Sequence, residues 1–109
     1  MQPHEWTTND FKGDPGIDYC HDKFLFAHSL HTLPERMIGA RMRFGMAIYC
    51  RQGAALITVD GLQYRLKQGQ SFSYQEGSLI EECLASSDAD LGLMGLPWEL
   101  NAAAGALDN

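Results

Sequence analysis

The sequence predicts an all-β fold in a single domain, on three observations. Apolar and polar residues alternate with period two in several short segments, which is the pattern of half-buried strands and not of helices. Eleven glycines and four prolines lie between these segments and suggest many turns. About seven of the alternating or apolar segments follow one another at a spacing of roughly 8–12 residues, which is typical of β-sandwiches and barrels. The length of 109 residues is that of one domain.

The first third of the chain divides into an arm, a strand and a loop. Residues 1–22 are polar and show no clear period, so we expect an irregular N-terminal arm. The barrel is expected over residues 23–96 and begins with an alternating strand at 23–30. Residues 31–39 contain Pro34, which favours a loop or a single helical turn.

The clearest periodicity lies in residues 41–50. Alternation over ten residues predicts one half-buried strand, with its even positions facing a core or a cavity. Those inward positions are Met42, Phe44, Met46 and Ile48.

The remaining strands follow at glycine-containing turns. The Asp60-Gly61 pair is a strong hairpin signal, because both residue types tolerate positive φ. The expected strands are 55–59, 62–67, 70–74, 78–84 and 91–96. Residues 97–109 are alanine-rich and are expected to form a tail or the start of a linker.

The bulk properties exclude several classes. The formal net charge is −6, with only eight Lys and Arg residues and no basic run, so we expect no DNA binding by this chain itself. The cysteines form no CxxC pair, which argues against a zinc ribbon or a redox motif and favours free thiols in a reducing cytosol. These residues are Cys20, Cys50 and Cys83. Without a signal peptide or a long apolar run, the expected location is cytoplasmic, away from membranes.

The spacing of residues 69–80 resembles the second motif of the cupin family, whose members form a small double-stranded β-helix, or jelly-roll, barrel. Gly69 and Gly77 stand at the motif's glycine positions, and Gln75 stands where the motif has a proline. Ile80 takes the position of a metal-binding histidine.

The first cupin motif can be laid on residues 40–53. With Gly53 as its final glycine, Met46 takes the glutamate position, and Ala40 and Met42 take the two histidine positions. All four metal-ligand positions therefore carry apolar side chains, which suit none of the metals that cupins hold. The resemblance thus implies a cupin barrel that binds no metal, and we expect no other cofactor.

A narrower resemblance covers residues 50–72, which are similar to the N-terminal sensor domain of AraC-type transcription regulators. The shared pattern consists of Gly53, Asp60, Gly61, Tyr64, Leu66 and Gly69. In that family a metal-free cupin barrel receives a small effector or serves dimerisation, and a separate C-terminal pair of helix-turn-helix units reads DNA.

The resemblance implies a non-catalytic sensing and dimerisation domain, with DNA contacted only through a C-terminal domain that this chain lacks. An exposed barrel edge or the apolar strand Phe24–His28 would suit self-pairing, so a homodimer is expected. The alternative is a free-standing small cupin protein, including an enzyme with non-standard metal ligands.

The expected effector site lies inside the barrel. Its wall would be formed by Met42, Phe44, Met46, Ile80 and Glu82. Glu82 follows Ile80 by two residues, so in a regular strand its carboxylate would face inward and meet a hydroxyl or amine of a mainly apolar molecule. If that strand is bulged or lies at an edge, Glu81 and Glu82 both face water. The interior of so small a barrel can also be filled completely by side chains.

Other chemistry-bearing residues lack partners in the sequence. His21, His28 and His31 are interpreted as partly exposed histidines, because the segment reads as a strand and a loop and no motif places a third zinc ligand. Cys83 lies beside Glu82 but has no positioned base. We therefore expect no catalytic residues.

Overall fold

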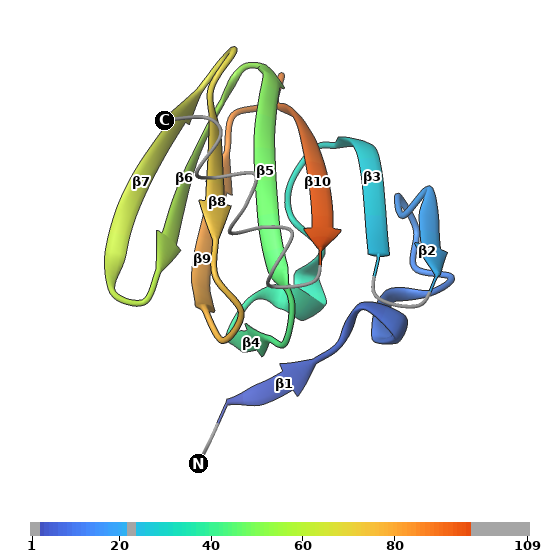
Figure 1. Ribbon diagram of the computed structural model, residues 1–109. Helices are drawn as coiled ribbons and strands as arrows, with labels where there is room; N and C mark the ends of the chain where they lie inside the picture. The colour runs from blue at the N-terminus through green and yellow to red at the C-terminus, as the bar shows by residue number, and fades with distance from the viewer. Residues whose placement is uncertain (1–2, 22–23, 97–109) are drawn as a thin grey trace.

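The computed structural model describes residues 3–21 and 24–96. Over these ranges the chain folds into two five-stranded sheets and two short 3₁₀ helices, η1 (Thr8–Phe11) and η2 (Glu35–Met37) (Figure 1). The prediction of an all-β fold is confirmed, and of the two alternatives for residues 31–39, a loop or a single helical turn, η2 forms the helical turn. The winding of a double-stranded β-helix stays a prediction.

The first sheet has the strand order β1-β4-β9-β6-β7. Its strands are β1 (His4–Trp6), β4 (Ala40–Met42), β9 (Leu79–Ala85), β6 (Ala54–Val59) and β7 (Leu62–Lys67). All neighbours pair antiparallel except β1 and β4, which are parallel. The β6–β7 hairpin turns at Asp60-Gly61, where both residues have positive φ, as the turn signal predicts.

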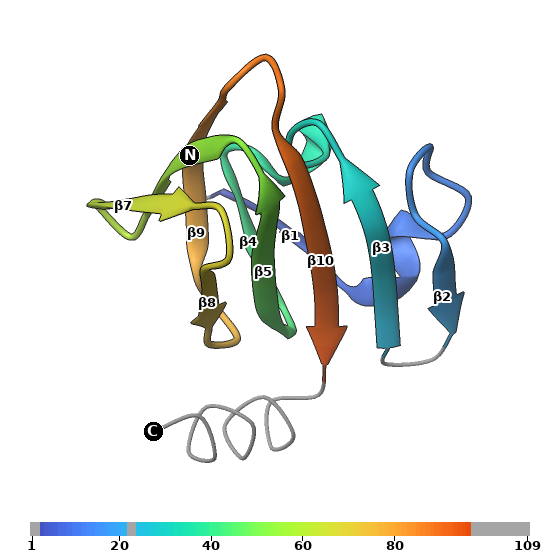
Figure 2. The same cartoon turned by 90° about the horizontal axis from the view of Figure 1, so that it is seen from above.

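The second sheet has the order β2-β3-β10-β5-β8, and every pairing in it is antiparallel. Its strands are β2 (Tyr19–His21), β3 (Phe24–Leu30), β10 (Asp90–Leu96), β5 (Gly45–Gln52) and β8 (Ser71–Tyr74). Figure 2 shows this sheet from above, with β10 flanked by β3 and β5.

The long strand expected at 41–50 is instead two strands, one in each sheet. β4 ends at Met42 and belongs to the first sheet, whereas β5 begins at Gly45 in the second. The chain crosses between the sheets at Arg43 and Phe44. The predicted direction of the side chains is nevertheless confirmed, because all four even positions are buried.

Residues 3–21 contain more regular structure than the expected irregular arm. β1 lies along β4 and β2 along β3, so this segment extends both sheets. Phe11 in η1 is completely buried and packs against Phe44, with 6.2 Å between the ring centroids. Trp6 Nε1 donates a hydrogen bond of 2.8 Å to the carbonyl oxygen of Arg36. Three-residue strands are too short to show a period in the sequence.

The core lies between the two sheets and forms one hydrophobic cluster. It includes inward residues of β3, β5 and β10 from the second sheet and of β4, β6, β7 and β9 from the first. No helix within residues 3–21 and 24–96 has the length and hydropathy of a membrane-spanning segment. The tail expected at 97–109 lies outside the described residues.

Candidate functional site

Four of the five predicted effector residues come together in the core. Met42, Met46 and Ile80 are fully buried and Phe44 is nearly so, and all four belong to the same hydrophobic cluster. Ala40 is also buried there and pairs with Ile80 across β4 and β9. The positions that carry metal ligands in the cupin motifs are thus occupied by packed apolar side chains. Binding of a ligand in this interior stays a prediction.

The fifth residue, Glu82, is not part of this group, and its expected inward direction is wrong. The pairing of β9 with β6 shifts by one residue: Ile80 pairs with Val59 and Glu82 with Thr58, which leaves Glu81 as the extra residue of a β-bulge. A bulge reverses the alternation beyond it, so Glu82 is exposed to solvent. Glu81 Oε1 accepts a hydrogen bond of 2.7 Å from the backbone N–H of Gly61.

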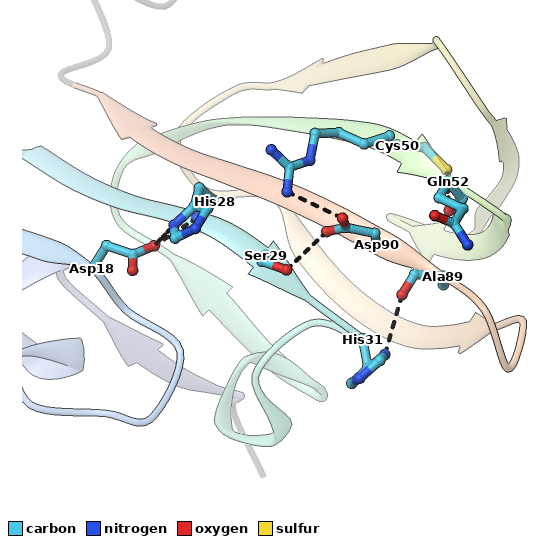
Figure 3. A network of polar contacts seen from close by, with 9 residues as sticks. Asp18, His28, Ser29, His31, Cys50, Gln52, Ala89 and Asp90 are labelled. Atoms are coloured by element: carbon cyan, nitrogen blue, oxygen red, sulfur yellow. Dashed lines mark hydrogen bonds and ion pairs between the residues drawn. The ribbon is translucent and has the colours of Figure 1, made fainter.

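The histidines considered as metal ligands are exposed and lie apart from this interior; they are His21, His28 and His31. His28 Nδ1 lies 2.7 Å from Asp18 Oδ2, and His31 Nδ1 lies 3.2 Å from the carbonyl oxygen of Ala89 (Figure 3). The backbone N–H of His28 also donates to Asp18, and these two bonds hold the pKa of the Asp18 carboxyl below its usual value. Within the described part of the chain no three His, Cys, Asp or Glu side chains converge as metal ligands would.

The half-buried Cys20 thiol, the buried Cys50 thiol and the buried Tyr74 phenol all have raised pKa values. Burial raises the pKa of the Cys20 and Cys50 thiols, which opposes the thiolate that a nucleophile requires. Burial also raises the pKa of the Tyr74 phenol, with smaller contributions from Tyr64 and Cys83. None of these groups has the lowered pKa of an activated nucleophile.

The outer face of the second sheet carries a feature of which the sequence indicated only one part, the apolar strand Phe24–His28. Five large apolar side chains, each 40–52% exposed, come from four adjacent strands and form what we call the aromatic sheet face. They are Tyr19, Phe24, Phe26, Tyr49 and Met94.

The centre of the aromatic sheet face is shallowly hollowed. Met94 pairs with Phe26 on one side and with Ala47 on the other, and Gly92 pairs with Tyr49. Because Gly92 and Ala47 fill little space, a depression of about 180 Å³ lies between the larger side chains.

Both signs of charge border one end of this face. Arg51 Nη2 lies 3.1 Å from Asp90 Oδ2. Ser29 donates a hydrogen bond of 3.1 Å to the same carboxylate (Figure 3). The Asp18–His28 pair lies on β3 and the segment before β2. Such a mixed border suits contact with a surface that also carries both signs.

Comparisons with known proteins give similarity at the level of structure alone. No protein-family model matches the chain, and no curated protein matches it significantly. A protein of unknown function from Rhizobium leguminosarum bv. viciae has a similar solved structure, with a TM-score of 0.51 and 14% identity over 89% of this chain and 99% of that one. At this identity the similarity shows a shared fold and nothing about activity.

Two further solved structures are more distantly similar. The Cnp3 cupin domain of Schizosaccharomyces pombe matches with a TM-score of 0.47 and 17% identity over 87% of this chain and 66% of that one. The EutQ protein of Clostridium difficile matches with a TM-score of 0.44 and 14% identity over 82% and 63%. The chain thus spans less than two thirds of the length of either. Scores below 0.5 do not establish a common fold.

Proposed function

We propose that this chain is a non-catalytic, cupin-like domain that forms a homodimer and senses a small molecule, as the N-terminal domains of AraC-type regulators do. The observation that carries the proposal is the aromatic sheet face. Isolated apolar residues are normal on protein surfaces, whereas a contiguous group of large ones marks an interaction site. In a two-fold dimer the same surface of both copies meets, so a second copy can cover this face with its own.

The interior supports the non-catalytic part of the proposal. The positions of the four cupin ligands are filled by Ala40, Met42, Met46 and Ile80, whose side chains offer no imidazole or carboxylate to a metal. Methionine is flexible and adapts to different neighbours. Met42 and Met46 could therefore repack around an apolar effector, with Glu82 contributing nothing because it faces solvent.

Sedimentation equilibrium tests the dimer. We expect wild-type protein to be dimeric at about 100 µM and Phe26→Glu to be monomeric, because the introduced carboxylate would be desolvated at the centre of the interface. Leu62→Glu is the matched control, since Leu62 is 62% exposed but lies on β7 of the other sheet. Circular dichroism verifies that both variants fold. A monomeric wild type, or equal dissociation of both variants, would refute the proposed interface.

A free-standing small domain is the second candidate. One observation favours it: the solved Rhizobium leguminosarum chain is matched over 99% of its length, so that chain consists of this one domain. The reading frame beyond Asn109 separates the two candidates. An encoded pair of helix-turn-helix units supports the regulator, and a stop codon supports the free-standing domain.

A further inference from the structure

The arginines of this protein differ in whether they form ion pairs with carboxylates. Four of them form ion pairs, with nitrogen–oxygen distances of 2.8–3.9 Å to carboxylates. They are Arg36, Arg41, Arg43 and Arg51. Arg65 is the one arginine of the described residues without a carboxylate partner, although acidic residues outnumber basic ones by 14 to 8. Lys67, two residues further along β7, also forms no ion pair among the described residues.

Arg65 and Lys67 line a groove on the outer face of the first sheet. Its volume is about 620 Å³, within the range of small-molecule sites. The other lining residues come from β6, β9 and the turns that follow β5, β7 and β9: Gly53, Ala54, Ala55, Leu56, Gln68, Leu84, Ala85 and Ser86. Apart from the two cations the groove is therefore lined mainly by apolar or small side chains.

Strand pairing places the cations at one side of an apolar strip. Leu56 on β6 pairs with Arg65 on β7 and with Leu84 on β9, so these three side chains form a row across the outer face. Adjacent strands are about 4.8 Å apart, so the row extends roughly 10 Å from Leu84 to Arg65. Ala54 pairs with Lys67, which sets the second cation beside the first. Leu84 is 56% exposed, and at this residue β9 pairs with β6 alone, because the β4 pairing covers only Leu79 and Ile80.

The β-bulge of β9 produces this arrangement. In a regular strand Leu84 would share the buried face of Ile80, but the extra residue Glu81 turns Leu84 outward, into the groove. The same shift turns Glu82 outward, one row away from Leu84 and opposite Thr58. A negative charge on the β9 side disfavours an anion there. An anionic head group is therefore directed toward Arg65 and Lys67 on the far side.

We propose that this groove is a binding site for a small organic carboxylate with an apolar body of medium chain length. Its carboxylate accepts hydrogen bonds from the Arg65 guanidinium and the Lys67 ammonium, and its apolar body covers Leu56 and Leu84. The planar fork of an arginine matches a carboxylate in two parallel bonds. The site lies outside the barrel interior and on the opposite sheet from the aromatic sheet face, so the inference is independent of the function proposed above.

Calorimetric titration with sodium octanoate tests the site. The double variant Arg65→Gln/Lys67→Gln should weaken octanoate binding by about tenfold, because it removes both charge-assisted contacts. Lys12→Gln removes one positive charge from an exposed lysine that does not line the groove, and should change the affinity less than about twofold. Leu84→Gln should weaken octanoate binding and leave the solubility of the protein unchanged.

Two ligand controls separate the head group from the apolar body. Octylamine has the same tail with the opposite charge, and acetate has the same head without the tail, so neither should bind measurably at concentrations that saturate with octanoate. Equal binding of octanoate by wild type and the double variant overturns the proposal, as does binding of octylamine or no binding of octanoate by wild type. Sedimentation of the double variant reports on the dimer separately, so failure of the groove and of the proposed function are distinguishable.

Discussion

Replacement of Met46 by alanine distinguishes a filled core from a ligand cavity in the barrel interior. Met46 is fully buried in β5 and pairs with Tyr74 on β8 and Gly95 on β10. The substitution removes three heavy atoms, worth about 2.4 kcal/mol in lost burial at 0.8 kcal/mol per methylene-sized group. A cavity left in a packed core increases the loss, so the free energy of unfolding should fall by roughly 2.5–5 kcal/mol.

Leu62→Ala is the matched control, because it also removes three heavy atoms. Leu62 lies on β7 of the first sheet, away from the aromatic sheet face, and is 62% exposed. The truncation there removes about 0.4 of the transfer term, or roughly 1 kcal/mol, and leaves no enclosed cavity. Both free energies of unfolding are measured by urea unfolding at a fixed protein concentration. If Met46→Ala costs no more than Leu62→Ala, the interior is already hydrated or empty around Met46, and the packed core is refuted.

Two further predictions concern close packing and pH. Gly95→Ala should lower the free energy of unfolding by about 1–3 kcal/mol, because the added Cβ would lie 2.9 Å from a ring carbon of buried Phe44. Gly92→Ala is the control, since the nearest atom to its added Cβ lies at 3.8 Å. In the same urea assay its free energy of unfolding should be close to that of wild type. Asp18→Asn should remove stability that is present above pH 3.8, the ordinary pKa of the carboxyl, because bonds from His28 lower that pKa in the folded state. The difference from wild type should therefore be larger at about pH 5 than at about pH 3, and a difference that grows on acidification would contradict this reasoning.

Strand β9 shows that the residue pattern within one strand does not always determine which side chains face inward. The pair Glu81–Glu82 in an otherwise apolar segment is compatible with a regular strand that buries one carboxylate and with a bulged strand that buries neither. The choice depends on which residue of β6 faces each residue of β9, and the paired residues lie 21 to 30 positions apart in the sequence, from Val59–Ile80 to Ala55–Ala85. The bulge costs one unpaired residue but keeps both charges in water, where their solvation is retained.

The sequence by itself determined the all-β class, most of the strands and the buried side of residues 42–48, because period-two alternation and turn glycines act over only a few residues. The tertiary structure determined which strands are neighbours and which side chains share a face of a sheet. It divided residues 41–50 between two sheets, reversed the direction of Glu82 and Leu84, and brought Phe26 beside Met94. These outcomes depend on pairing between distant strands, and no local period encodes which strands become neighbours.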